Sequence, residues 1–222
     1  MLQSSTIKFL KDLTRNNNKP WIDEHRNDYL NAKADFENFV AILIKETAAF
    51  DSEVKDLLVK DCTYRQNRDV RFSKDKRPYK NNMGAYIARD GKKSVFAGYY
   101  FHFEPGGKCF TGGGLWMPET ADLKKVRQEI DYCYKEFTAI VNNKNFKITF
   151  GNLEQSSNYK LVNLPRGYEK ENPAVEYLKL KSFLALKPIS DKELLEKDLA
   201  KKVIQSFKAL MPLVKFINRS LE

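Results

Sequence analysis

The sequence predicts an α+β fold with a central, largely antiparallel sheet bracketed by N-terminal and C-terminal helices. Apolar residues recur every three or four positions towards both ends of the chain, which is typical of amphipathic helices. In the middle of the chain they alternate with other residues, which is typical of strands. Since the helices flank the strands instead of alternating with them, a doubly wound parallel sheet is disfavoured. The 222 residues, 42% of them apolar, are enough to fill one domain covering residues 1–222.

Two helices are expected in the N-terminal part. The first covers residues 4–13, begins at a serine cap and ends at three consecutive asparagines. The second is a long amphipathic helix that starts at Pro20, a favoured first helical residue, and reaches Ala48.

The middle of the chain is expected to form the sheet. The stretch SVFAGYYFHFEPGGKCFTGGGLW predicts a β-hairpin, because alternating residues lead into a Pro-Gly-Gly turn and a returning strand. The other expected strands cover residues 62–72, 83–89, 146–150, 159–162 and 182–187.

Two further helices are expected towards the C-terminus. One follows Pro118 and keeps an apolar side as far as Ile140. The last helix begins at a capping box formed by Ser190 and Glu193, and Pro212 is expected to kink or end it.

The charge and the cysteines restrict partners and location. The formal net charge of +10 favours anionic partners such as nucleic acid, phosphorylated metabolites or acidic protein surfaces. No apolar run is long enough for a signal peptide or a membrane span, so no membrane partner is expected. Cys62, Cys109 and Cys133 are far apart in the sequence, which predicts reduced thiols and a cytoplasmic location.

No cofactor is expected. The triplet Gly112-Gly113-Gly114 is not followed by the Lys-Ser/Thr of a phosphate-binding loop. No strand leads into the glycine-rich turn of a dinucleotide-binding fold, and the scattered cysteines and two histidines disfavour a zinc site. Familiar hydrolase motifs and paired-carboxylate signatures are also missing from the sequence.

Half of the surplus positive charge lies in residues 65–80, RQNRDVRFSKDKRPYK, which hold seven cations and two carboxylates. On the expected strand, Arg65, Asp69 and Arg71 share a polar face, whereas Arg68 falls on the apolar face and needs a partner. One interpretation is a solvated face on which Asp69 neutralises an arginine. The other is an anion site in which Asp69 orients the arginines, because guanidinium groups bind phosphate or carboxylate through paired donors.

The rest of this segment is expected to be a loop broken by Pro78, with Lys76 and Tyr79 at the rim of the anion site. Such a loop is consistent with a solubilising tip, and an aromatic ring among cations is also typical of single-stranded nucleic-acid contacts. Three functions therefore remain open. A pocket for an anionic small molecule is favoured, and the alternatives are a nucleic-acid-binding module using residues 74–80 and a protein–protein interaction domain.

His102 is the candidate catalytic residue, as an acid or base. It shares a predicted strand face with Glu104 and with Tyr100, a further candidate ligand-binding residue, and the glycine triplet lies on the returning strand. The missing glycine side chains suit a pocket floor or a close approach of the backbone. The alternatives are a half-buried histidine bonded to a strand neighbour, and glycines at a β-bulge. Weaker candidates are Trp116, Arg166 and Tyr168.

The charged segment also contains the pattern RxxRDxRF followed by DKxxY. This pattern resembles the signature of a bacterial family of conserved hypothetical proteins, the domain of unknown function 2461. The stretches NNNKPW, AGYYFHFEPG, GGGLWMPE and PRGY are similar to other recurrent stretches of that family, so the resemblance covers nearly the whole chain. It implies a site at the arginine motif and a bacterial cytoplasmic setting, but no reaction. The residues that carry the motif are Arg65, Arg68, Asp69, Arg71, Phe72, Asp75, Lys76 and Tyr79.

Overall fold

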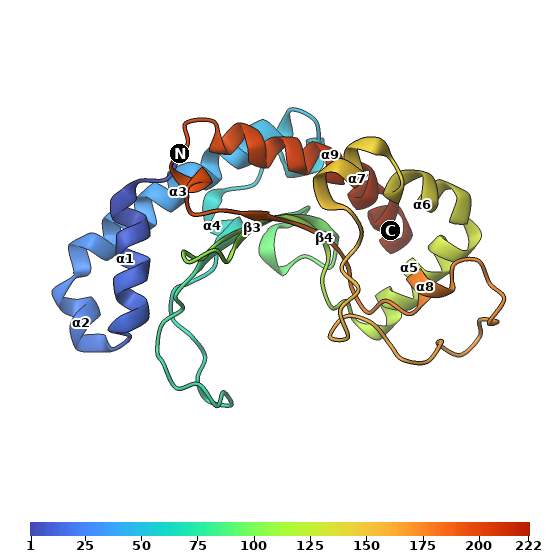
Figure 1. Ribbon diagram of the computed structural model, residues 1–222, viewed down its shortest axis with the longest axis horizontal. Helices are drawn as coiled ribbons and strands as arrows, with labels where there is room; N and C mark the ends of the chain where they lie inside the picture. Colours follow the sequence, from blue (N-terminus) through green and yellow to red (C-terminus); the bar gives the residue numbers. More distant parts are fainter.

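Four strands form one antiparallel sheet in the order β1-β2-β3-β4, so each strand pairs with its neighbour along the chain. The computed structural model describes residues 1–222. Helices stand at both ends of the chain, which confirms the predicted α+β class (Figure 1). The strands are β1 (Met83–Ile87), β2 (Gly98–Phe103), β3 (Cys109–Leu115) and β4 (Phe183–Ile189).

The chain contains nine α-helices, and none is both long enough and apolar enough to cross a membrane. Those before the sheet are α1 (Ser4–Arg15), α2 (Lys19–Glu24), α3 (Arg26–Ala48) and α4 (Val59–Cys62). Those between β3 and β4 are α5 (Thr120–Tyr132), α6 (Tyr134–Val141), α7 (Lys144–Phe150) and α8 (Val175–Leu178). The chain ends with α9 (Leu199–Leu221).

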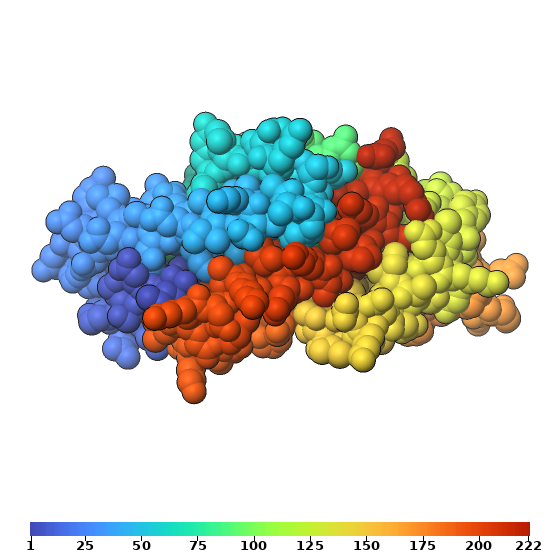
Figure 2. All heavy atoms as spheres, turned by 90° about the horizontal axis from the view of Figure 1, so that it is seen from above, coloured from blue at the N-terminus to red at the C-terminus, as the bar shows by residue number.

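One face of the sheet is covered by α3 and α9, which lie side by side across it (Figures 1 and 2). Alternate residues of β2, Tyr99, Phe101 and Phe103, are fully buried on this face. The ring of Phe39 in α3 lies 5.0 Å from that of Phe101, and the ring of Phe207 in α9 lies 5.1 Å from that of Tyr99. Each such buried side chain contributes about 1.5–3 kcal/mol through the hydrophobic effect. The residues between them on β2 therefore face the opposite side of the sheet.

Two buried polar contacts fix the start of β2 to the helical layer. The side chain of Asn218 in α9 accepts from the backbone N–H of Ala97 at 2.7 Å and donates to its carbonyl at 3.2 Å. The hydroxyl of Tyr99 donates to the buried carboxylate of Asp51 at 2.7 Å. Both contacts satisfy groups that would be costly to bury unpaired.

The glycine triplet allows the close approach of backbones within the sheet. The register of β3 with both neighbours is unbroken through Gly112, Gly113 and Gly114, so these residues do not form a bulge. All three have positive φ angles and are buried. A methyl group at any of them would run into a backbone carbonyl oxygen of β2 or β4. The triplet is thus a packing requirement of the sheet.

The expected hairpin and the strands over residues 83–89 and 182–187 are confirmed, but two other strand predictions are wrong. Residues 146–150 lie in helix α7, where Phe146 and Phe150 are four positions apart and their rings meet at 5.2 Å. Over so short an apolar run, alternation does not separate strand from helix. Residues 159–162 form only a single β-bridge, between Lys160 and Leu180.

The prediction of a strand over residues 62–72 is also wrong. Cys62 ends the short helix α4, and the next residues form an irregular hairpin with one β-bridge to β1, from Thr63 to Ala85, and one to its own return arm, from Asn67 to Tyr79. A two-stranded ribbon is marginally stable unless an apolar face is covered. Here Phe72 is 95% exposed, so no packed face sustains a longer ladder.

The helix boundaries differ from the predicted ones in three places. The helix expected from Pro20 to Ala48 is divided at His25, which has non-helical backbone angles and stacks its ring on Trp21. A similar break at Cys133 separates α5 from α6. The predicted capping box of Ser190 and Glu193 forms at a short 3-10 turn, Glu193–Leu195, and not at the last helix. That helix, α9, begins only at Leu199.

Pro212 does not end the last helix, which continues to Leu221. Its missing N–H removes a single helical hydrogen bond. The buried residues on both sides of it, among them Leu210 and Leu213, hold the helix against the core.

Candidate functional site

The arginine motif lies on the basic hairpin, here defined as residues 63–82, between α4 and β1. It projects from the side of the sheet opposite to α3 and α9 (Figure 1). The backbone N–H of Arg68 donates to the carbonyl of Pro78 at 2.9 Å, and that of Lys80 donates to the carbonyl of Gln66 at 2.8 Å. The buried side-chain amide of Gln66 also donates to the carbonyl of Lys80. The two arms are therefore joined at their base.

Asn17 anchors the hairpin to the loop after α1. Its side-chain amide donates to the carbonyl of Tyr79 at 2.9 Å, and its side-chain oxygen accepts from the backbone N–H of Tyr79 at 3.0 Å. The asparagine run that ends the first helix thus has a second role, which is to hold the return arm of the hairpin in place.

A cavity of about 470 Å³ opens at the base of the hairpin. Its lining is entirely polar and combines three cations, two carboxylates and two amides. The lining residues are Arg68, Asp69, Asp75, Arg77, Lys80, Asn81 and Asn82. This cavity is called the hairpin cavity below, and Arg68, Asp69 and Asp75 of the arginine motif line it.

Asp75 is the centre of the fixed charges in this cavity. Arg68 forms an ion pair with it, and Arg77 binds it through Nη2 at 2.6 Å and through Nε at 3.0 Å. The guanidinium groups of Arg77 and Arg68 hold the pKa of Asp75 far below its usual range. Asp75 is therefore the partner of Arg68. Because it already binds two guanidinium groups, Asp75 is not a partner for a third cation.

Lys80 has no such partner. It forms no ion pair, and its ammonium group lies 5.3 Å from the centre of the Tyr64 ring. Burial lowers the pKa of Lys80, and the neighbouring charges of Arg65 and Arg68 lower it further. Lys80 is thus a partly buried cation without an ion pair, in a lining that holds three cations and two carboxylates.

The remaining motif residues lie outside the cavity, apart from Asp69. Asp69 lines it and orients Arg71, which binds its carboxylate through Nε at 3.0 Å and through Nη2 at 2.7 Å. The Arg71 side chain is 76% exposed. Lys76 donates to the carbonyl of Val70 at 3.0 Å and so closes the tip of the hairpin. Arg65, Arg71, Lys76 and Tyr79 are therefore not brought together with Arg68 in the cavity lining.

His102 lies on the free face of the sheet, within a hydrogen-bonded chain that runs along β2. The hydroxyl of Tyr100 is 3.2 Å from His102 Nδ1, and His102 Nε2 is 3.3 Å from a carboxylate oxygen of Glu104. The imidazole also stacks on the ring of Phe110 in β3, with ring centres 4.7 Å apart. Gly84 leaves room for this arrangement, because a β-carbon there would lie 2.5 Å from the Tyr100 hydroxyl.

The protonation states along this chain follow from its geometry. Burial raises the pKa of Glu104, but hydrogen bonds from Lys108 and His102 outweigh it, so the pKa is lowered and the group is ionised. An ionised carboxylate only accepts, so Nε2 of His102 carries the proton. Burial lowers the pKa of His102 more than Glu104 raises it, which keeps the ring neutral. Nδ1 therefore accepts from the hydroxyl of Tyr100, and both ring nitrogens are occupied.

Asn81 connects this chain to the hairpin cavity. Its side chain donates to Glu104 at 3.1 Å, and Asn81 is itself part of the cavity lining. The pKa of Arg77 is raised mainly by Asp75 and, to a smaller extent, by the charge of Glu104 across the same boundary. His102 is not one of the lining residues, so the two features are neighbours linked through Asn81 and Glu104.

The weaker candidates lie elsewhere. Trp116 is 66% exposed beyond the end of β3. Tyr168 packs near Arg127, whose guanidinium donates to the carbonyl of Leu180 at 2.9 Å. Neither Arg166 nor these residues line the hairpin cavity, and no three His, Cys, Asp or Glu side chains are grouped to hold a metal ion.

Sequence reasoning missed Lys80, Asn81 and Asn82 as members of the site. They follow the motif directly, but they were assigned to a loop because the hairpin pairing was not recognised. The available signal was the position of Pro78 between two charged arms of similar length, which fits a chain reversal. A reversal places the residues after Pro78 beside those of the RxxRD part of the motif.

Comparison with known proteins identifies a family but no activity. No curated protein and no solved structure matches the chain. A family model described as "Conserved hypothetical protein (DUF2461)" matches residues 5–216, which include the basic hairpin, the whole sheet and most of α9. The chain therefore belongs to the DUF2461 family of conserved hypothetical proteins.

Proposed function

We propose that the protein binds a small anionic ligand, bearing phosphate or carboxylate, in the hairpin cavity. The observation that carries this proposal is the ammonium group of Lys80, which forms no ion pair and lines the cavity together with Arg68 and Arg77. An anion placed there would offset the mutual repulsion of the three cations, so binding and charge relief would be coupled. Arg77 and Arg68 are held by Asp75, which fixes their donors in place before the ligand arrives.

The amides of Asn81 and Asn82 add neutral hydrogen-bonding groups to the same cavity. A tetrahedral phosphate group or a carboxylate has several acceptor oxygens and can use both kinds of donor. The resemblance to a bacterial family and three free cysteines support a bacterial cytoplasmic setting as part of the proposal.

Replacing Lys80 by methionine is expected to weaken binding of pyrophosphate by about 30-fold or more. The change keeps the length of the side chain and removes its charge, and loss of one partner of a desolvated charge pair costs about 2–5 kcal/mol. Isothermal titration calorimetry with pyrophosphate and inorganic phosphate measures the effect. Lys74→Met is the matched control, because Lys74 is exposed near the hairpin tip and does not line the cavity.

Equal affinities for the wild type and Lys80→Met, or no binding of either anion to the wild type, would contradict this assignment. The nucleic-acid alternative predicts a different result. It would use Phe72, 95% exposed at the hairpin tip, and the cations around it. Oligonucleotide affinity would then fall with salt at a slope of about −0.7 per phosphate contacted and would be reduced by Lys74→Met.

The same proposal places the chain of Tyr100, His102 and Glu104 beside the bound ligand, because Asn81 lines the hairpin cavity and donates to Glu104. Neither Tyr100 nor His102 lines the cavity, so His102 would act on the ligand only at a distance. Its lowered pKa matters, because only the neutral ring can accept a proton.

We expect the titration midpoint of His102 to lie below about 6.5 in the free protein and to rise when pyrophosphate is bound. The sign follows because burial disfavours the imidazolium ion, whereas a nearby anion favours it. NMR titration of the ring protons, with His25→Gln to assign the signals, measures both midpoints. A midpoint that is unchanged at saturating pyrophosphate would place the ligand too far from His102 for acid–base chemistry. Lys80→Met should abolish the rise.

A further inference from the structure

A patch of aromatic rings lies on the free face of the sheet, opposite to the face that α3 and α9 cover (Figure 1). It consists of Tyr64, Tyr100, His102 and Phe110 and is here called the aromatic floor. Tyr64 is 41% exposed, and the other three residues are partly buried. The ring centre of Phe110 lies 5.6 Å from that of Tyr100 and 4.7 Å from that of His102. Aromatic rings at such distances are in contact, so these three form one surface.

The strand register explains how Tyr64 joins this surface. Gly84 in β1 pairs with His102 in β2, which in turn pairs with Phe110 in β3. The β-bridge one residue away places Tyr64 opposite Gly84, and the backbone N–H of Tyr64 donates to the carbonyl of Gly84 at 3.3 Å. Directly opposed residues of neighbouring strands have their side chains on the same face. Tyr64, His102 and Phe110 therefore lie in one row across the sheet.

Gly84 lets the ring of Tyr100 lie against the sheet. A β-carbon at Gly84 would be 2.5 Å from the Tyr100 hydroxyl and 3.2 Å from the ring carbon that carries it. The ring thus packs on the backbone of β1, and its other side is turned away from the sheet. Burial raises the pKa of Tyr100, and the neighbouring Tyr64 raises it further, so the phenol is neutral. An uncharged ring in this position provides a π face on which another flat ring can stack.

The aromatic floor adjoins the hairpin cavity at two points. Lys80 lines the cavity, and its ammonium group lies 5.3 Å from the centre of the Tyr64 ring. Asn81 also lines the cavity and donates to Glu104, whose carboxylate lies 3.3 Å from His102 Nε2. A ligand with its anionic group beside Lys80 therefore has aromatic rings within reach of the rest of the molecule.

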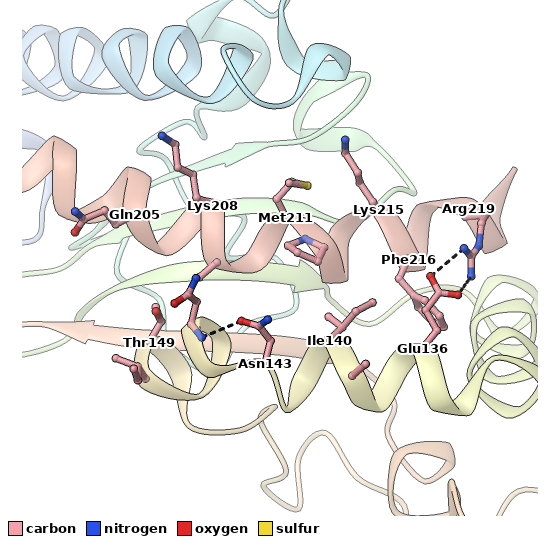
Figure 3. Close-up of a pocket in the computed structure, with 15 residues that line it drawn as sticks. Glu136, Ile140, Asn143, Thr149, Gln205, Lys208, Met211, Lys215, Phe216 and Arg219 are labelled. Carbon is pink, nitrogen blue, oxygen red and sulfur yellow. Dashed lines mark hydrogen bonds and ion pairs between the residues drawn. The ribbon is translucent and has the colours of Figure 1, made fainter.

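The largest hollow of the protein has no comparable combination of groups. Its volume is about 1050 Å³, and it lies between α9 and the segment of α6 and α7 (Figure 3). The side chains of Lys208 and Lys215 leave α9 on the side away from α6 and α7, and the Lys208 ammonium lies 5.7 Å from the centre of the Phe50 ring. Arg219 is paired with Glu136 at 2.9 Å. These charged groups identify no occupant of that hollow.

We propose that the ligand of the hairpin cavity is a nucleoside phosphate whose base stacks on the aromatic floor. This inference rests on the proposed function, because it needs a phosphate group beside Lys80. The cavity supplies cations and amides for the phosphate, and the floor supplies the π faces of uncharged rings. Nucleic-acid bases are flat, and each has a π face that stacks on aromatic side chains. A nucleoside phosphate joins a base to a phosphate through the sugar, so one small molecule uses both neighbouring surfaces.

The test compares two ligands that share a phosphorylated ribose and differ in the base. Adenosine 5′-monophosphate (AMP) carries adenine where ribose 5-phosphate carries a hydroxyl group. With the full-length protein, isothermal titration calorimetry is expected to show that AMP binds about tenfold or more tighter, which is the gain from stacking one base. In Tyr64→Leu and in Phe110→Leu this ratio is expected to fall to about threefold or less. The affinity for ribose 5-phosphate should stay within about threefold of the wild type in both variants, because Lys80 and the arginines remain.

Tyr132→Leu is the matched control, because Tyr132 is 80% exposed on α5 and is not part of the aromatic floor. It should leave the ratio of the two affinities unchanged, and circular dichroism should show cooperative melting of all three variants. Proton NMR gives a second measurement, in which ring currents move the adenine proton signals of bound AMP upfield in the wild type and less so in Tyr64→Leu.

The outcomes separate this inference from the anion site itself. Equal affinities of AMP and ribose 5-phosphate for the wild type, with both lost in Lys80→Met, would overturn the nucleotide inference and leave the anion site intact. If neither of them nor pyrophosphate bound, the anion site would fail and the inference with it. A preference for AMP that survives both Tyr64→Leu and Phe110→Leu would place the base elsewhere and overturn the proposal. Binding of a single-stranded oligonucleotide that AMP does not displace would also overturn it, because the aromatic floor would then serve a nucleic-acid chain.

Discussion

Gly112→Ala is expected to destabilise the protein by at least about 4 kcal/mol, the largest effect of any single substitution considered. A β-carbon at this position would run into the backbone carbonyl of Ala185 in the neighbouring strand β4. Neither strand can retreat without breaking the ladder on both sides of β3. The positive φ of 146° adds backbone strain for any other residue. Overpacking and strain each cost about 1–3 kcal/mol, and occasionally more.

Urea denaturation followed by circular dichroism measures this loss. Gly151→Ala is the control, because Gly151 also has a positive φ, of 73°, but a β-carbon there meets nothing within 4 Å. Its cost should be about 1–3 kcal/mol, from the strain of its backbone angles alone (φ 73°, ψ −75°). If the two variants unfold at similar urea concentrations, the close backbone approach at Gly112 is not the reason for the glycine triplet.

Tyr99→Phe is expected to cost about 3 kcal/mol. The Tyr99 hydroxyl donates to the carboxylate of Asp51 at 2.7 Å, and both residues are buried. Burial and the bond to Asp51 both raise the pKa of Tyr99, so the phenol remains a donor at every pH at which the protein is folded. Removing a bond to a charged group costs about 1.5–3 kcal/mol, and the stranded carboxylate adds a desolvation penalty.

Tyr86→Phe provides the comparison within the same sheet. Its hydroxyl donates to the carbonyl of Phe96 at 2.8 Å, a neutral acceptor, so the loss should be about 1 kcal/mol. Free energies of unfolding from urea titrations at pH 7 test the difference. A Tyr99→Phe protein as stable as Tyr86→Phe would show that Asp51 is not held as a buried, charged acceptor.

The fold class could be predicted because the strongest local signals agree with the tertiary packing. In β2 the alternation of Tyr99, Phe101 and Phe103 with smaller or polar residues matches one face covered by α3 and α9. The turn after Phe103 and the returning strand follow from the Pro-Gly-Gly sequence alone. These elements need no knowledge of distant residues.

The failures occurred where distant contacts decide the structure. The alternation in residues 62–72 is real, but its partner arm is short and highly charged, and nothing covers its apolar side. The run of residues 146–150 alternates as a strand would, yet packing of Phe146 on Phe150 and the cap at Asn143 make it a helix. Breaks at His25 and Cys133 likewise leave no clear trace in the apolar spacing.

The sequence predicts which charged residues belong to the candidate site, but it does not predict how they are arranged in space. Arg68 pairs with a carboxylate, although the strand face on which the sequence places it does not form. The identity of that carboxylate, Asp75, depends on the course of the hairpin. Lys80 was one cation among seven in the sequence, and only the folded arms show that it lacks a carboxylate. The two ring nitrogens of His102 are both occupied, which no pattern along the chain indicates.

The central claim is that an anion binds next to Lys80, and the most direct measurement is an anomalous difference map from crystals soaked in selenate. Selenate is a tetrahedral dianion that stands in for a phosphate group, and its selenium scatters anomalously. The proposed site predicts a peak in the hairpin cavity, with selenate oxygens at hydrogen-bond distance, about 2.7–3.2 Å, from Lys80 Nζ and from a guanidinium nitrogen of Arg68 or Arg77. Selenate peaks elsewhere on the surface, with none beside Lys80 in an unobstructed cavity, would contradict it.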